Sequence, residues 1–132
     1  MTYSLLHVED TEIIRWVVSD NLGKAFPNLV LYEAVNGAEG LEHCLRGPVD
    51  IVVTDKNMPI MDGSQFLAEL KKAYLEQGRA LPVLVMMSTH YKPEDASKIG
   101  VDYCVPKINS IDPLIEMIGK ILQRLDAKRE KK

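Results

Sequence analysis

Carboxylate side chains stand at the ends of two short apolar runs, each of which indicates a buried strand. Glu9 and Asp10 follow the run over residues 4–8, and Asp55 follows the run over residues 49–54. Grouped carboxylate oxygens are the ligands that a hard divalent cation prefers, and an aspartate oxygen can also act as a nucleophile. The three acids are therefore candidates for a metal site that carries out a group transfer.

A cation and a hydroxyl group are expected close to the same acids. Lys107 follows the last predicted strand, and Ser88 lies at the end of the fourth. Two carboxylates about 4 Å apart repel each other by about 4 kcal/mol at an effective dielectric constant of about 20, so three of them need compensating charge. One Mg²⁺ ion and the Lys107 ammonium group would balance them, and the lack of His and Cys ligands among these groups argues against zinc or copper. The residue types therefore predict a Mg²⁺ site.

The most specific signal in the chain is the loop motif Asp-x-x-Met-Pro-x-Met-Asp-Gly over residues 55–63. Pro59 favours an extended conformation at Met58, and Asp62 is placed to cap a following helix. Gly63 gives the backbone additional freedom at the end of the motif. A single aspartate at a strand end would be weak evidence, but this complete spacing is strong evidence for a functional loop.

Apolar runs and helical patterns alternate along the chain, and this alternation predicts the architecture around the acids. Strands are predicted at residues 4–8, 29–35, 49–54, 81–87 and 101–105. Helices are predicted at residues 11–25, 38–46, 94–99 and 111–125, with a further helix that opens at residues 62–64 and ends before Gly78. We expect an α/β fold of the flavodoxin-like, doubly wound type, with five helices and a five-stranded parallel sheet in the order 2-1-3-4-5. Strands one and three are neighbours in that order, so the acids would meet at the carboxyl edge of the sheet.

Length and composition limit the class of protein. The chain has 132 residues and a net charge of −3, which suits one domain without a general attraction for nucleic acid. No apolar stretch approaches the ~18 residues that a membrane span needs. Cys44 and Cys104 lack a CxxC motif, and we expect reduced, buried thiols in a cytoplasmic protein. Residues 1–126 are expected to form the domain, followed by a charged C-terminal tail or linker stub over residues 127–132.

Taken together, these motifs resemble the CheY-like receiver domain of two-component response regulators over nearly the whole chain. The resemblance implies that Asp55 accepts a phosphoryl group from a histidine kinase or a histidine phosphotransfer protein. It implies that Lys107 pairs with this phosphoryl group and that a Ser or Thr at the end of strand four, here Ser88, contacts it. It implies Mg²⁺ as the cofactor, with these ligands: Glu9, Asp10, Asp55 and the backbone carbonyl of Asn57.

The same resemblance implies a signalling module and not a metabolic enzyme, with its own self-phosphorylation and autodephosphorylation chemistry. Phosphorylation would switch the binding of a downstream protein partner, or would act on an output domain missing from this sequence. A homodimer could form through the face made by helix four, strand five and helix five. Neither nucleic acid nor a membrane is expected as a direct partner.

The end of strand five departs from the family pattern. The usual Lys-Pro order is reversed as Pro106-Lys107, which leaves open whether the Val105–Pro106 bond is cis. Cys104 stands where an aromatic switch residue is usual, with Tyr103 one position earlier. These departures put an aromatic switch in this chain in question.

The end of strand four allows two registers. Counting from Pro82 puts Met87 at the position of the hydroxyl residue, whereas the pattern of residue types puts Ser88 there. We favour Ser88, because a methionine thioether cannot donate a hydrogen bond.

These departures motivate an alternative, a degenerate receiver that binds partners without being phosphorylated. A further alternative is a phosphohydrolase of the haloacid dehalogenase type. That class has Asp-x-Asp at the end of the first strand, whereas here Asp55-Lys56-Asn57 follows the third. The hydrolase is therefore the weaker of the two alternatives.

Overall fold

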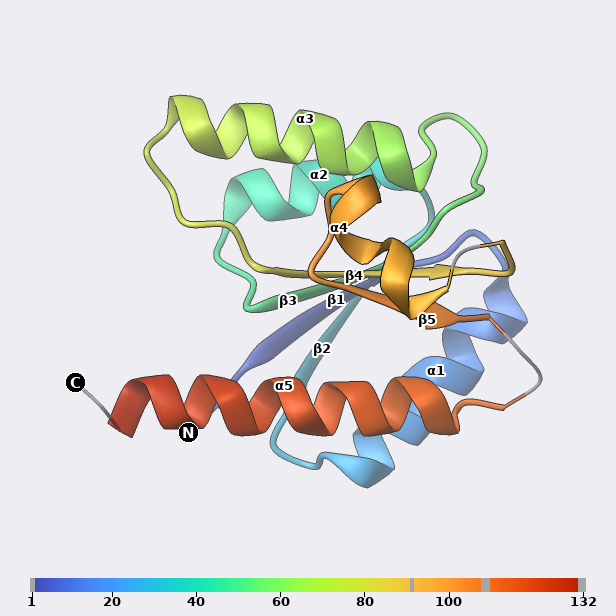
Figure 1. Cartoon of the computed structure of the whole chain (residues 1–132). Coiled ribbons are helices and arrows are strands. Elements are labelled where there is room, and N and C mark those ends of the chain that lie inside the picture. Colours follow the sequence, from blue (N-terminus) through green and yellow to red (C-terminus); the bar gives the residue numbers. More distant parts are fainter. Residues whose placement is uncertain (1, 91, 108–109, 131–132) are drawn as a thin grey trace.

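The computed structural model describes residues 2–90, 92–107 and 110–130 as a parallel sheet with helices on both faces (Figure 1). The sheet has the order β2-β1-β3-β4-β5, with strands β1 (Ser4–Val8), β2 (Val30–Ala34), β3 (Ile51–Asp55), β4 (Val83–Ser88) and β5 (Tyr103–Pro106). The helices are α1 (Glu12–Ala25), α2 (Gly37–Arg46), α3 (Gly63–Glu76), α4 (Ala96–Ile99), which follows a 3₁₀ turn, and α5 (Asp112–Glu130). The predicted flavodoxin-like α/β architecture is confirmed.

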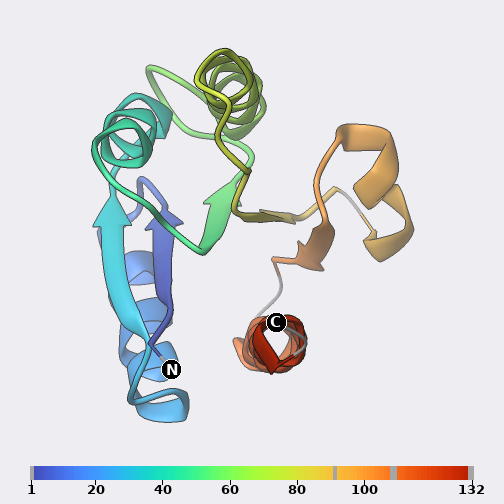
Figure 2. The same ribbon diagram turned by 90° about the vertical axis from the view of Figure 1, so that its left-hand side faces the viewer.

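Each face of the sheet is covered by its own apolar core. Successive side chains of a strand point to opposite faces, so in β1 the side chain of Leu6 packs beneath α2 and α3, whereas Leu5 packs against α1 and α5. Phe66 of α3 and Ile118 of α5 are fully buried in these two cores. Figure 2 shows α2 and α3 together on one face and α5 on the opposite face. Burial on both faces explains why the central strands β3 and β4 appear in the sequence as continuous apolar runs, whereas the edge strand β2 is mostly exposed.

Side-chain caps determine where α2 and α3 begin, at the edge of the sheet where the acids lie. The side chain of Asn36 accepts a hydrogen bond from the Glu39 N–H at 2.9 Å and so caps α2. At α3, the Asp62 carboxylate accepts from the Gln65 N–H at 2.8 Å, and the Gln65 side chain accepts from the Asp62 N–H at 3.1 Å. This reciprocal capping box satisfies two backbone N–H groups and ends the loop after β3 at a defined residue.

The last helix is longer than predicted. It continues to Glu130, so residues 127–130 of the predicted tail are helical, while residues 131–132 lie outside the described residues. The Tyr3 hydroxyl donates to Asp126 at 2.8 Å, and the Arg129 guanidinium lies 4.2 Å from the centre of the Tyr3 ring. These contacts give the final turns a surface to pack on. Neither α5 nor any other described helix combines the length and apolarity that a membrane crossing requires.

A histidine is buried in the sheet beneath the acidic edge. His7 of β1 is 2% exposed, and its Nδ1 atom has no hydrogen-bond partner among the described residues. Burial, followed by the positive charges of Lys107 and Arg15, lowers the pKa of His7 from its usual 6.5 to about 3. His7 is therefore neutral in the folded protein over a pH range in which the unfolded chain takes up a proton.

We expect His7→Leu to remove part of the acid sensitivity of the fold. Because the folded-state pKa of His7 lies below the unfolded value, its contribution to stability is present above pH 6.5 and is lost as the pH falls toward 3. In denaturant titrations without divalent metal, the unfolding free energy of His7→Leu relative to wild type should rise by about 1 kcal/mol per pH unit below pH ~6. If the unfolding free energies of the two proteins changed equally with pH, the buried, neutral state assigned to His7 would be wrong.

Candidate functional site

The carboxyl ends of β1 and β3 bring the three predicted acids together. One oxygen of each of Glu9, Asp10 and Asp55 lies within 4.8 Å of the others. Glu9 and Asp55 are only 1% and 8% exposed, whereas Asp10 is exposed. Val8 and Thr54 are partners in the parallel pairing of β1 with β3, so the residues that follow them leave the sheet at the same edge. The strand order thus creates the cluster from two distant parts of the chain.

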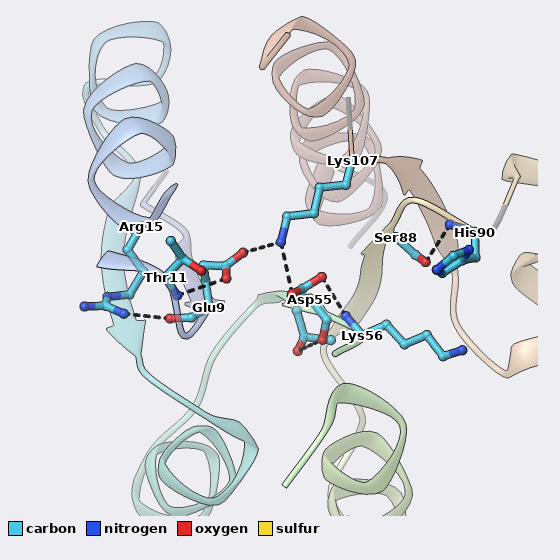
Figure 3. Close-up of polar contacts among 9 residues, drawn as sticks. Glu9, Thr11, Arg15, Asp55, Lys56, Ser88, His90 and Lys107 are labelled. Atoms are coloured by element: carbon cyan, nitrogen blue, oxygen red, sulfur yellow. Dashed lines mark hydrogen bonds and ion pairs between the residues drawn. The ribbon is translucent and has the colours of Figure 1, made fainter. Parts of the chain in front are cut away.

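Lys107 lies between the two buried acids. Its Nζ is 2.8 Å from Glu9 Oε1 and 3.0 Å from Asp55 Oδ2 (Figure 3). Partial burial acts against the charged ammonium group, but the hydrogen bonds and charges of the two carboxylates outweigh it and raise the pKa of Lys107. Burial raises the pKa of Glu9, although hydrogen bonds from Lys107 and from the Thr11 N–H oppose this shift. A single cation therefore offsets the repulsion of two carboxylates that have little access to water.

Backbone contacts orient Asp55 and the loop that follows it. The Lys56 N–H donates to Asp55 Oδ1 at 2.9 Å, and the Gly63 N–H donates to the Lys56 carbonyl at 2.8 Å. A Cβ atom at Gly63 would lie 2.2 Å from the Asp55 carbonyl oxygen, which no side chain can tolerate. Glycine at the end of the motif thus lets the start of α3 approach the strand end that carries Asp55.

The start of α2 closes the same loop from the other side. The Gly37 N–H donates to the Met61 carbonyl at 3.0 Å, and a Cβ atom at Gly37 would lie 2.6 Å from that oxygen. Met61 and Met58 pack against the core beneath α2 and α3. The two methionines of the motif therefore anchor the loop, while Ile60 between them is 83% exposed and has a positive φ of 70°.

The three carboxylates fit a magnesium ion by their chemistry and spacing. Mg²⁺ binds oxygen ligands at about 2.0–2.1 Å, so ligands on opposite sides of the ion are about 4 Å apart. The oxygens of Glu9, Asp10 and Asp55 lie within 4.8 Å of one another, which is close to that separation. Asn57 follows in an exposed part of the loop, and the assignment of its carbonyl as a ligand stays a prediction.

The structure separates the two candidates for the hydroxyl position on β4. Met87 is the pairing partner of Asp55, and its side chain belongs to the core between the sheet and the α1 and α5 helices. Ser88 lies one residue further along, is 3% exposed, and accepts a hydrogen bond from the His90 N–H at 3.0 Å on its Oγ atom (Figure 3). The Ser88 hydroxyl is thus engaged by the loop after β4 rather than by Asp55 or Lys107, and its role stays a prediction.

Three residues near the end of β5 have unusual types for their positions: Tyr103, Cys104 and Pro106. The Val105–Pro106 peptide bond is trans. Cys104 is buried in the core beneath α2 and α3, whereas Tyr103 contacts Arg124 of α5, with 5.4 Å between the guanidinium carbon and the ring centre. Despite the reversed Pro-Lys order, Lys107 reaches both buried acids.

Two residues that hold the acidic pair were missed by the sequence analysis. The Thr11 N–H donates to Glu9 Oε2 at 3.1 Å, and Arg15 Nη1 donates to the Glu9 carbonyl at 2.8 Å. Neither contact has a signal in the spacing of residue types. A backbone carbonyl or N–H is present at every such position, and its direction is known only once the chain has folded.

Comparisons with known proteins agree on one family. The model of the response regulator receiver domain family matches residues 5–119. A two-component response regulator of Oryza sativa is 32% identical over 127 residues, which cover 96% of this chain and 89% of that protein. Chemotaxis protein CheY-3 of Vibrio cholerae is 32% identical over 124 residues, which cover 92% of each. A protein-glutamate methylesterase/protein-glutamine glutaminase of Methanosarcina acetivorans is also 32% identical, but this chain spans only 28% of its length.

Solved structures share the fold. The N-terminal domain of an uncharacterized protein from Wolinella succinogenes aligns with a TM-score of 0.77 and 25% identity, covering 96% of this chain and 99% of that one. The response regulator TrrA from Thermotoga maritima, solved in complex with Mg(2+)-BeF, aligns with a TM-score of 0.74 and 26% identity over 90% of this chain and 98% of its own. Both superpositions extend over nearly the whole of the compared domains.

We expect Lys107→Met to destabilise the fold in a way that depends on charge. Without divalent metal at pH 7, the unfolding free energy should fall by about 2 kcal/mol, because Glu9 and Asp55 lose their compensating cation. The loss should shrink toward pH 5, since the pKa of Glu9 is already raised and a protonated Glu9 no longer repels Asp55. Chemical denaturation at both pH values measures this change.

The matched control is Lys120→Met, which removes the same charge from an exposed pair with Glu116 at 3.4 Å and should change stability by less than about 0.5 kcal/mol. A loss for Lys107→Met that is equal at pH 5 and pH 7 would show that the lysine stem, and not its charge, supports the site.

A methyl group at Gly63 should disrupt the loop of the site. We expect Gly63→Ala to lower the unfolding free energy by about 2–3 kcal/mol, because the Asp55 carbonyl belongs to the sheet and cannot move away. Gly47→Ala is the control, since a Cβ atom there meets nothing within 4 Å. Thermal or denaturant unfolding compares the two variants, and equal stability would show that the close approach at Gly63 is relieved at no cost.

Proposed function

This chain belongs to the family of response regulator receiver domains of two-component systems, and we propose that Asp55 is its phosphoacceptor. The proposed donor is a histidine kinase or a histidine phosphotransfer protein. The proposed cofactor is Mg²⁺, with Glu9, Asp10, Asp55 and the Asn57 carbonyl as ligands. The observation that carries this proposal is the Lys107 ammonium within 3.0 Å of a carboxylate that also belongs to a three-acid cluster.

The geometry suits an in-line transfer to aspartate. An Asp55 oxygen would form a bond to phosphorus while the phosphorus–nitrogen bond of the donor histidine breaks and its imidazole keeps the electron pair. The Lys56 N–H donates a hydrogen bond to Asp55 Oδ1 at 2.9 Å and so keeps the carboxylate oriented. The Lys107 ammonium group lies beside Oδ2 and would stabilise the negative charge of the phosphoryl oxygens during the transfer. A bound Mg²⁺ would supply further neutralisation of that charge.

The added charge provides a route to a conformational response. A phosphoryl group contributes about −1 to −2 at neutral pH and would compete with Glu9 for the Lys107 ammonium. The Lys107 N–H donates to the Ser88 carbonyl at 3.1 Å, so a shift at Lys107 also acts on the end of β4. We expect this shift to alter binding of a downstream protein or an output domain, with the α4–β5–α5 face as the contact or homodimer surface.

We propose that the chain acts as a signalling module and not as a metabolic enzyme. The methylesterase relative is named for an activity of a protein of which this chain covers 28%. The acidic site described above offers three carboxylates and a lysine, which suit acceptance and hydrolysis of its own phosphoryl group. A cytoplasmic location is proposed together with this role, and the buried, free thiols of Cys44 and Cys104 agree with it.

One observation favours a second candidate function, a receiver that binds partners without phosphorylation. Met87, not a hydroxyl residue, lies opposite Asp55 in the sheet, and the Ser88 hydroxyl is bonded to the His90 N–H. A site without a mobile hydroxyl would respond less strongly to phosphorylation. Measuring phosphorylation directly separates the two functions.

Incubation with acetyl phosphate or phosphoramidate and Mg²⁺ should add the mass of one phosphoryl group. The gain should vanish in Asp55→Asn, which cannot form the acyl phosphate, and persist in Asp20→Asn, which alters only a surface pair with Lys24 at 3.0 Å. Intact-mass spectrometry provides the readout. If no donor adds the mass of a phosphoryl group, the result favours the receiver that acts without phosphorylation. Steady release of phosphate from many phosphate esters would instead indicate a phosphohydrolase.

A further inference from the structure

A guanidinium group holds the peptide unit that carries the acidic pair. Arg15 Nη1 donates a hydrogen bond to the Glu9 carbonyl oxygen at 2.8 Å (Figure 3). The Arg15 side chain is only 17% exposed, and its Nε lies 4.0 Å from a carboxylate oxygen of Glu33 on the edge strand β2. The guanidinium therefore connects α1 and β2 to the turn that follows β1.

This hydrogen bond acts on the direction of Asp10. The Glu9 carbonyl belongs to the planar peptide unit between Glu9 and Asp10, so holding its oxygen fixes the rotation of that unit. The Glu9 side chain is buried and is held separately by the Thr11 N–H and by Lys107. Asp10 is exposed, and the backbone sets the direction in which its side chain leaves the chain, which limits where the carboxylate can reach.

We propose that Arg15 is a positioning residue of the metal site. Through the Glu9 carbonyl it holds the Glu9–Asp10 peptide in the orientation in which Asp10 joins Glu9 and Asp55 around a cation. The inference rests on the proposed function, because it concerns the Mg²⁺ on which phosphorylation of Asp55 would depend. The positioning effect of Arg15 passes through one peptide unit, because its contact with the acidic pair is at the Glu9 carbonyl.

Charge alone predicts the opposite effect on metal binding. The Arg15 guanidinium lies 2.8 Å from the Glu9 carbonyl oxygen, so its positive charge is close to the carboxyl end of β1. Removal of a positive charge near three carboxylates would strengthen the binding of a divalent cation. Loss of a positioning contact would weaken that binding, because Asp10 would no longer be held in place. The direction of the change therefore separates the two effects.

The experiment measures Mg²⁺ affinity of the whole chain by isothermal titration calorimetry for wild type, Arg15→Met and Arg15→Lys. Residues that orient metal ligands from outside typically change metal affinity by about 10–100-fold, so we expect the Kd of Arg15→Met to rise at least about tenfold. Arg15→Lys keeps the charge and a single donor, and its Kd should lie between those of the other two proteins. Arg46→Met is the matched control, because Arg46 is an exposed arginine on α2 that pairs only loosely with Glu42 at 3.8 Å.

A kinetic readout distinguishes positioning from general damage. The Mg²⁺ concentration for half-maximal phosphorylation by acetyl phosphate should rise with the Kd, while the rate at saturating Mg²⁺ stays close to that of wild type. Melting temperatures without metal report whether each variant folds, and if Arg15→Met does not fold, Arg15→Lys decides by the same criterion. An unchanged or lower Kd in any folded Arg15 variant overturns the inference.

The same titrations keep this inference apart from the proposed function. If wild type binds Mg²⁺ and is phosphorylated but the Arg15 variants bind equally well, the positioning role fails and the function stands. If wild type neither binds Mg²⁺ nor gains a phosphoryl group, the proposed function fails and the inference fails with it. A Kd increase confined to the Arg15 variants, and absent in Arg46→Met, supports both.

Discussion

An ammonium group held between two buried carboxylates is the interaction on which the acidic edge of the sheet depends. Glu9 and Asp55 are almost inaccessible to water, and burial of unpaired carboxylates carries a large desolvation cost. Lys107 contacts both of them and joins the ends of three strands, β1, β3 and β5, although β4 lies between the last two. The parallel sheet makes this possible, because all of its carboxyl ends reach the same edge.

The same arrangement connects Asp55 to other elements of the fold. Any group that draws Lys107 toward Asp55 weakens its contact with Glu9, whose backbone is held by α1 through Arg15. The backbone N–H of Lys107 is bonded to the Ser88 carbonyl, so the end of β4 is connected to the same residue. These contacts connect the two buried carboxylates with α1, β4 and β5.

Local patterns in the sequence predict the strands and a parallel sheet buried on both faces. The flavodoxin-like order expected for such a sheet then predicts that Glu9, Asp10, Asp55 and Lys107 meet. The pattern could not show that Arg15 bonds the Glu9 carbonyl or that Gly63 lies against the Asp55 carbonyl, since these depend on the direction of backbone groups in the folded chain. The end of α5 was misplaced for a related reason. The Tyr3 ring that supports its final turns comes from the opposite end of the chain.

Strand β4 shows how a one-residue shift redirects a functional side chain. Adjacent residues of a strand face opposite ways, so Met87 and Ser88 cannot both point to the side occupied by Lys107. Met87 faces that side and lines a surface groove together with Lys107, Ile14 and Ile111. The Ser88 Oγ atom accepts a hydrogen bond from the His90 N–H, which leaves its own hydroxyl hydrogen available as a donor. Backbone hydrogen bonds connect the acidic site to β4 at two points, from the Lys107 N–H to the Ser88 carbonyl at 3.1 Å and from the Lys56 N–H to the Met87 carbonyl at 3.3 Å.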